Sequence, residues 1–109
     1  MHTTYAFLKD TKNRICFGQK MISFIKNLFG SELEIMTWKD SSSKLGYKII
    51  LTPKSGSSPF ILVSPDKWNR ITIPQEIMNI PSFSSVKNRR KQVACWIEKD
   101  KKLIIIRFQ

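Results

Sequence analysis

The chain has 109 residues, which is the length of one domain and too short for two ordinary independent cores. Hydrophobic residues make up 41% and charged residues 25%, so we expect a folded domain rather than a disordered segment. Nineteen lysines and arginines against eight acidic residues give a net charge of +11, which indicates a polyanionic partner, with nucleic acid ahead of an anionic membrane.

Residues that usually carry catalysis or bind metals are few and scattered along the chain. The single histidine is His2, and the two cysteines, Cys16 and Cys95, are predicted to be buried free thiols of a reducing compartment. Glu32 and Glu34 are expected on a solvated strand edge. We therefore predict no metal, no cofactor and no enzymatic activity. Neither a membrane span nor a signal-peptide pattern is found, so we expect a cytoplasmic protein that does not enter a membrane.

The first half is predicted to contain short strands, one amphipathic helix and a strand hairpin. Apolar residues recur at helical spacing before Gly30, a typical helix stop. In chain order the expected elements are a strand at 5–9, a turn at 10–14, a strand at 15–17, a helix from Met21 to Phe29, and a hairpin of strands 33–39 and 47–52.

The second half repeats this order after a linker rich in turn-forming residues. Asp10, Asn13, Arg14, Ile15 and Gln19 match identical residues 56 positions later. The predicted organisation is one domain, 1–109, with repeat one at 1–53, a linker at 54–59 and repeat two at 60–109. The expected elements of repeat two are a strand at 60–63, a turn at 66–70, a strand at 71–73, a short helix at 75–79 and a hairpin of strands 93–98 and 102–108.

Both turns have the pattern Asp-x-x-Asn-Arg. Asparagine tolerates a left-handed backbone at low cost, so Asn13 and Asn69 are predicted to have positive φ in tight turns. The apolar runs at 49–51 and 104–106 predict strands buried on both faces.

The string from Asp66 to Ile77, followed by a hairpin, resembles the AbrB/MazE/MraZ family of swapped-hairpin transcription factors. That family has an acidic residue, a turn ending in Gly-Arg, a short β run, Ile/Leu-Pro, and a helix with an early glutamate. In both halves asparagine replaces the usual glycine before the arginine. The first half resembles the family more weakly, and it has Gly18 at the position that Pro74 occupies in the second half. The resemblance implies a mostly β fold with short helices, in which two pseudo-symmetric repeats form a swapped-hairpin, MraZ-like barrel.

The resemblance also implies a DNA-binding protein, and a transcriptional regulator, that contacts double-stranded DNA through its turns. Arg14 and Arg70 are the matched arginines, and their alternative role is a structural ion pair with the aspartate four residues upstream. Trp68 is expected to pack against the barrel end rather than to wedge into DNA. The expected DNA-contacting residues are Lys9, Lys12, Arg14, Lys67, Arg70, Lys87, Arg89, Arg90 and Lys91.

Other interpretations remain open. The cluster at 87–91 has the alternative of a solvated loop that aids solubility. A related fold also serves SymE-like toxins that bind or cleave RNA, and a small basic protein can be an interaction module for an acidic protein. The chain can complete the barrel alone, and further assembly into a homo-oligomer is left open.

Overall fold

The computed structural model describes residues 3–55 and 61–109. This part of the chain is mostly β, with two short helices and one 3-10 turn. This confirms the predicted fold class, a mostly β chain with short helices. The elements in chain order are β1 (Tyr5–Lys9), β2 (Arg14–Cys16), α1 (Gly18–Phe29), β3 (Leu33–Lys39), β4 (Tyr47–Pro53), β5 (Ile61–Val63), β6 (Arg70–Thr72), α2 (Gln75–Met78), η1 (Pro81–Phe83), β7 (Lys91–Glu98) and β8 (Leu103–Phe108).

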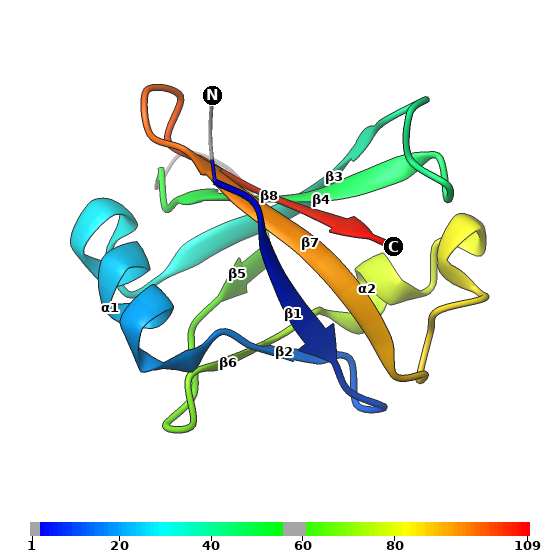
Figure 1. Cartoon of the computed structure of the whole chain (residues 1–109), viewed down its shortest axis with the longest axis horizontal. Helices are drawn as coiled ribbons and strands as arrows, with labels where there is room; N and C mark the ends of the chain where they lie inside the picture. Colours follow the sequence, from blue (N-terminus) through cyan, green and yellow to red (C-terminus); the bar gives the residue numbers. More distant parts are fainter. Residues whose placement is uncertain (1–2, 56–60) are drawn as a thin grey trace.

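All eight strands belong to one antiparallel sheet, with the order β5-β3-β4-β8-β7-β1-β2-β6. The two strands at the ends of this order, β5 and β6, follow one another in the chain and are joined by a tight turn. The sheet therefore curves until its ends approach, and it forms a nearly closed, barrel-like structure (Figure 1).

Strands of the two halves of the chain pair with one another. The hairpin β3–β4 of the first half takes β5 of the second half as its outer neighbour, with Leu33 opposite Val63. The hairpin β7–β8 of the second half pairs with β1 of the first half, from Tyr5 opposite Cys95 to Lys9 opposite Lys91. Pairing of β4 with β8 joins the two hairpins. Each half thus needs the other to complete its sheet.

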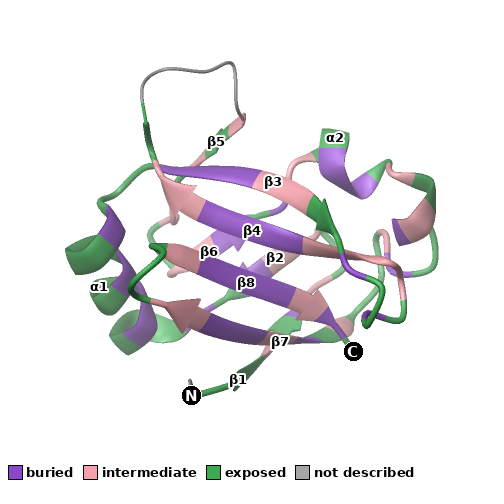
Figure 2. Cartoon of the chain, turned by 90° about the horizontal axis from the view of Figure 1, so that it is seen from above, coloured by how far each residue is buried: buried purple, intermediate pink, exposed green. Residues whose placement is uncertain are grey.

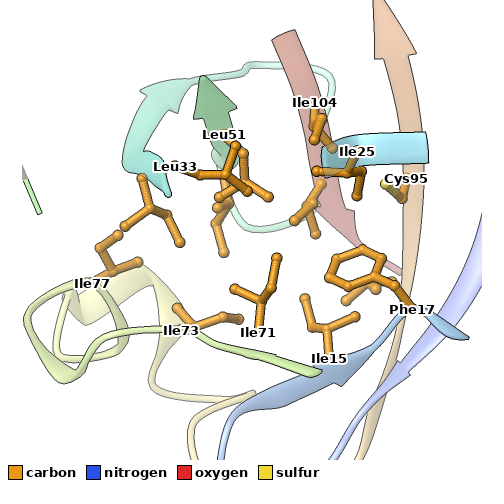
Figure 3. Packing of buried hydrophobic residues seen from close by; sticks show 14 of the residues in the cluster. Ile15, Phe17, Ile25, Leu33, Leu51, Ile71, Ile73, Ile77, Cys95 and Ile104 are labelled. Carbon is orange, nitrogen blue, oxygen red and sulfur yellow. The ribbon is translucent and has the colours of Figure 1, made fainter. Parts of the chain in front are cut away.

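The core lies inside the curved sheet and is built largely from isoleucine. Figure 3 shows Ile15, Ile71, Leu51 and Ile104 converging there from different strands. Neighbouring side chains in a strand point to opposite faces, so Ile50 lies outside and contacts a second, smaller cluster with buried Trp96 and Ile105. This confirms that the apolar runs 49–51 and 104–106 are buried on both faces.

The helices cover opposite ends of the barrel, α1 at one end and α2 at the other (Figures 1 and 2). The buried face of α1 carries Met21, Ile22 and Ile25, as the spacing predicted, and the helix stops before Gly30, whose φ is 90°. In the described part of the chain, no helix is long and apolar enough to cross a bilayer.

Of the two glutamates expected on a solvated strand edge, one is exposed and the other is buried. Glu34 is buried rather than solvated, and its Oε1 accepts hydrogen bonds from the backbone N–H and the hydroxyl of Ser55, at 2.9 and 2.8 Å. Glu32 is exposed as expected and pairs with Lys54 at 3.2 Å. Burial of Glu34 is tolerated because these donors replace water. His2, residues 56–59 of the linker and residue 60 of the predicted strand lie outside the described residues.

Candidate nucleic-acid interface

The first Asp-x-x-Asn-Arg turn is organised by the side chain of Asp10. Its Oδ1 accepts the backbone N–H groups of Lys12 and Arg14, at 3.0 and 2.9 Å. The turn is closed by two backbone bonds, from Asn13 N to the Asp10 carbonyl at 3.1 Å and from Asp10 N to the Arg14 carbonyl at 2.9 Å. The φ of Asn13 is 61°, as the sequence predicted.

The second turn reproduces this pattern. Oδ1 of Asp66 accepts the N–H groups of Trp68 and Arg70, both at 2.9 Å. Asn69 has a φ of 63°, again as predicted, and its N–H donates to the Asp66 carbonyl at 3.0 Å. The aspartate at the start and the asparagine before the arginine therefore build the same local structure twice.

Each turn also fixes its arginine. Nε of Arg14 donates to Oδ2 of Asp10 at 2.7 Å, and Nε of Arg70 donates to Oδ2 of Asp66 at 2.8 Å. The predicted alternative, a structural ion pair, is therefore present in both turns. The side chains of Arg14 and Arg70 are 26% and 23% exposed, and among the described residues no hydrogen bond from their Nη atoms is found.

The ion pairs also affect the aspartates. Partial burial works to raise the pKa of Asp10 and Asp66, because it disfavours the charged form. Hydrogen bonds from the arginine N–H groups and the arginine charge outweigh this effect. The pKa of both carboxyl groups is consequently held below its ordinary value, so both stay ionised and hold the turns at neutral pH.

A two-stranded ribbon, β2 paired with β6, sets the relation between the arginines. Its register centres on Ile15 opposite Ile71, and both side chains point into the core (Figure 3). Because side chains alternate along a strand, Arg14 and Arg70 both point outward from the same face. They are diagonal neighbours, with Cα atoms roughly 7–8 Å apart. Their side chains then diverge toward their own turns, which lie at opposite ends of the ribbon (Figure 1).

Lys9 is buried, which corrects its expected role as a phosphate contact. Its side chain has no exposed area, and Nζ donates to the carbonyls of Asp10 (3.2 Å) and Arg89 (2.5 Å) and to Oδ1 of Asn13 (3.0 Å). Burial lowers the pKa of Lys9, and the Asp10 charge opposes that effect. Three oxygen acceptors take the place of water around the ammonium group, so Lys9 has a structural role.

Through Lys9 the basic segment, defined here as residues 87–91, is attached to the first turn. Two further bonds join them: Nδ2 of Asn13 donates to Oδ1 of Asn88 at 2.9 Å, and Asn88 N donates to Oδ1 of Asn13 at 2.9 Å. The segment is thus attached to the first turn through Asn88 and the Arg89 carbonyl, while much of its surface stays exposed to solvent. Arg89 and Arg90 are exposed, while Lys91 is half-buried at the start of β7.

The remaining predicted cations lie around the same turns. Lys12 and Lys67 are exposed within the first and second turn, respectively. Lys87 is half-buried, and its Nζ donates to Oδ1 of Asn79. The fold therefore gathers eight of the nine predicted residues at or beside the ribbon and its turns, with Lys9 beneath them.

Two residues lie elsewhere than the sequence predicted, Trp68 in the second turn and Cys16 in β2. Trp68 does not pack against the barrel end: it is 58% exposed, with Nζ of Lys67 4.3 Å and Cζ of Arg70 4.6 Å from the ring centroid. Cys16 is exposed on the outer face of the ribbon, opposite Arg70, instead of being buried. Cys95 is buried as expected, and burial raises the pKa of its thiol to about 12.

The described residues offer no cluster of three or more His, Cys, Asp or Glu side chains that could hold a metal ion. Comparison of the chain with protein-family models, with curated proteins and with solved structures found no match.

Proposed function

We propose that the protein binds double-stranded DNA through the outer face of the β2–β6 ribbon, the two turns and the basic segment. The observation that carries the proposal is the shared outward orientation of Arg14 and Arg70 on one ribbon, each preorganised by its aspartate. A guanidinium held at Nε presents its Nη edge, which suits a guanine edge or a phosphate. The ion pair and the DNA contact are therefore compatible.

The charge around the ribbon supports a polyanionic ligand. Lys12 and Lys67 lie in the two turns, and the basic segment at the first turn adds Lys87, Arg89, Arg90 and Lys91. The charges of Arg14 and Arg70 are themselves balanced by Asp10 and Asp66. If these six cations each neutralise one phosphate, the plot of log binding constant against log salt should have a slope of roughly −5. Contacts of this kind position the DNA, while base contacts from the arginines would supply sequence preference.

A regulator of transcription is the biological role that this interface suits, in line with the resemblance of residues 66–77 to the AbrB/MazE/MraZ family. The pairing of strands between the halves is consistent with that resemblance, because a swapped-hairpin barrel needs it. The protein would then act by occupying DNA.

The test is fluorescence anisotropy of a labelled random-sequence duplex, followed by selection of bound sequences from a random pool at physiological salt. The double variant Arg14→Ala, Arg70→Ala should bind at least tenfold more weakly and select no sequence. The control is Lys99→Ala, Lys101→Ala, which removes the same formal charge from the tip of the β7–β8 hairpin, far from the ribbon (Figure 1).

The control should lose only the small affinity expected from net charge. Equal losses in both double variants would show that binding depends on overall charge and would refute the interface. Preferential competition by RNA would instead favour the RNA-binding alternative.

A further inference from the structure

The two turns have the same backbone conformation but carry different exposed side chains. At the third position of the pattern, the first turn has Lys12 and the second has Trp68, and both N–H groups are held by the aspartate of their turn at 3.0 and 2.9 Å. Trp68 is the most exposed of the large hydrophobic side chains that the structure describes, at 58%. Trp68 belongs to neither of the two hydrophobic clusters of the described residues.

The ring of Trp68 is accompanied by positive charge. Nζ of Lys67 lies 4.3 Å and Cζ of Arg70 4.6 Å from its centroid, both within the range of a cation–π contact. Both cations lie over the ring, so they restrain it and cover part of it, and a base would stack on the part that stays exposed. Aromatic rings beside cations are the usual elements of a surface that binds unpaired bases.

The segments corresponding to one another in the two halves also differ in their number of cations. The first turn is bonded through Asn13 to Asn88 and so carries the cations of the basic segment. The loop before β3, the corresponding place in the first half, contains Gly30, Ser31 and Glu32 and no cation. The basic segment is therefore attached at one end of the ribbon, and the exposed ring of Trp68 lies at the other end.

We propose that Trp68 is a base-stacking residue, and that the protein prefers DNA in which a base is unpaired at one end of an otherwise paired site. This inference rests on the proposed function. The first turn and the basic segment would hold paired DNA by its phosphates. At the second turn the ring of Trp68 would stack on the unpaired base, while Lys67 and Arg70 neutralise the adjacent phosphates.

The experiment compares a fully paired duplex with the same duplex carrying one unpaired 2-aminopurine near one end. Unstacked 2-aminopurine fluoresces, and its fluorescence is quenched when an aromatic ring stacks on it. Wild-type protein should bind the unpaired site roughly 5- to 150-fold more tightly, the range expected for one stacked base. It should also quench the probe.

Trp68→Ala should abolish both the preference and the quenching, so that this variant binds the paired and the unpaired site equally. Trp68→Phe should keep part of both, because a smaller ring still stacks. The matched control is Trp38→Ala: Trp38 is 43% exposed on β3, with Nζ of Lys48 6.0 Å from its ring centroid. This variant should behave as wild type. Unchanged urea midpoints verify that each variant is folded.

Equal binding of paired and unpaired sites by the wild type, or a preference that survives in Trp68→Ala, overturns the stacking proposal and leaves DNA binding by the arginines intact. Absence of any DNA binding overturns both. Tighter, Trp68-dependent binding of single-stranded RNA than of either duplex also overturns it, because the ligand would then be RNA.

Discussion

Asn13 and Asn69 make reciprocal contacts between the two halves of the chain. The carbonyl of Asn13 accepts the N–H of Ile73 at 2.8 Å, and the carbonyl of Asn69 accepts the N–H of Phe17 at 3.0 Å. Each turn is thereby tied to the segment that follows the strand of the other half. The left-handed residue of the turn not only reverses the chain but also aligns the ribbon that carries the arginines.

The two asparagines provide a matched pair for measuring how the basic segment is held. Glycine also adopts positive φ, so Asn69→Gly should change the free energy of unfolding by less than about 1 kcal/mol. Asn13→Gly should cost about 1–3 kcal/mol more, because it also removes the side chain that bonds Lys9 and Asn88. Urea unfolding measures both. Equal costs would contradict a stabilising role for the Asn13 side chain.

Lys9 should matter for stability although it cannot reach DNA. Lys9→Met keeps most of the side-chain volume but leaves the acceptors on Asp10, Asn13 and Arg89 without their donor, at a cost of about 1–3 kcal/mol. Amide exchange at residues 88–90 should become faster. Lys12→Met, at an exposed position of the same turn, should stay within about 0.5 kcal/mol of wild type. A stable Lys9→Met protein with unchanged exchange would argue against the buried contact.

The two thiols should differ in reactivity and report on the interface. Cys16 is exposed on the ribbon and should react with a maleimide in the native protein, whereas Cys95 should react only after unfolding. Bound DNA should slow the modification of Cys16, because the thiol lies opposite Arg70 on the proposed contact face. Mass spectrometry with and without duplex gives both rates. Full Cys16 reactivity at saturating DNA would place the binding surface elsewhere.

The aspartates of the turns predict how stability depends on pH. Their pKa values are lower in the folded state than the ordinary 3.8, so the folded protein holds fewer protons below that pH than the unfolded chain. Their contribution to the free energy of unfolding is present above pH 3.8 and is lost as the pH falls through the pKa of the folded state. Asp10→Asn, Asp66→Asn should therefore be less stable than wild type at pH 7.

The difference between this variant and wild type should shrink below pH 3.8. Urea midpoints at pH 7 and between pH 2 and 4 provide the measurement. A difference that does not change with pH would show that the aspartates act as turn formers whose charge contributes nothing.

Turn conformations, ion pairs within a turn and most secondary-structure elements could be predicted from the sequence. The positive φ of Asn13 and Asn69 follows from residue type, and the Asp–Arg pairs follow from a spacing of four within one turn. Hairpins and the amphipathic helix follow from the periodicity of apolar residues. The bounds of β3, Leu33–Lys39, were predicted to the residue.

Contacts between segments far apart in the chain could not be predicted from the sequence. Lys9 is buried because the carbonyl of Arg89, 80 residues away, meets its ammonium group, and no local pattern signals that approach. Cys16 was expected inside because its neighbours are apolar, but the register with β6 puts Ile15 in the core and Cys16 outside. The exposure of Trp68 likewise depends on the turn lying at a free end of the ribbon. Alternation within β2 was the one signal that could have placed Cys16 correctly.

The pairing of β1 with β7 and of β5 with β3 joins the two halves of the chain, so the barrel can be tested as two complementary fragments. Each half would present an open strand edge if produced alone, and its complement is the other half. Separate peptides of residues 1–55 and 56–109 should therefore recover a single barrel only when mixed. Reassembly would bring Arg14 and Arg70 together from two molecules, so that DNA binding would depend on the presence of both fragments.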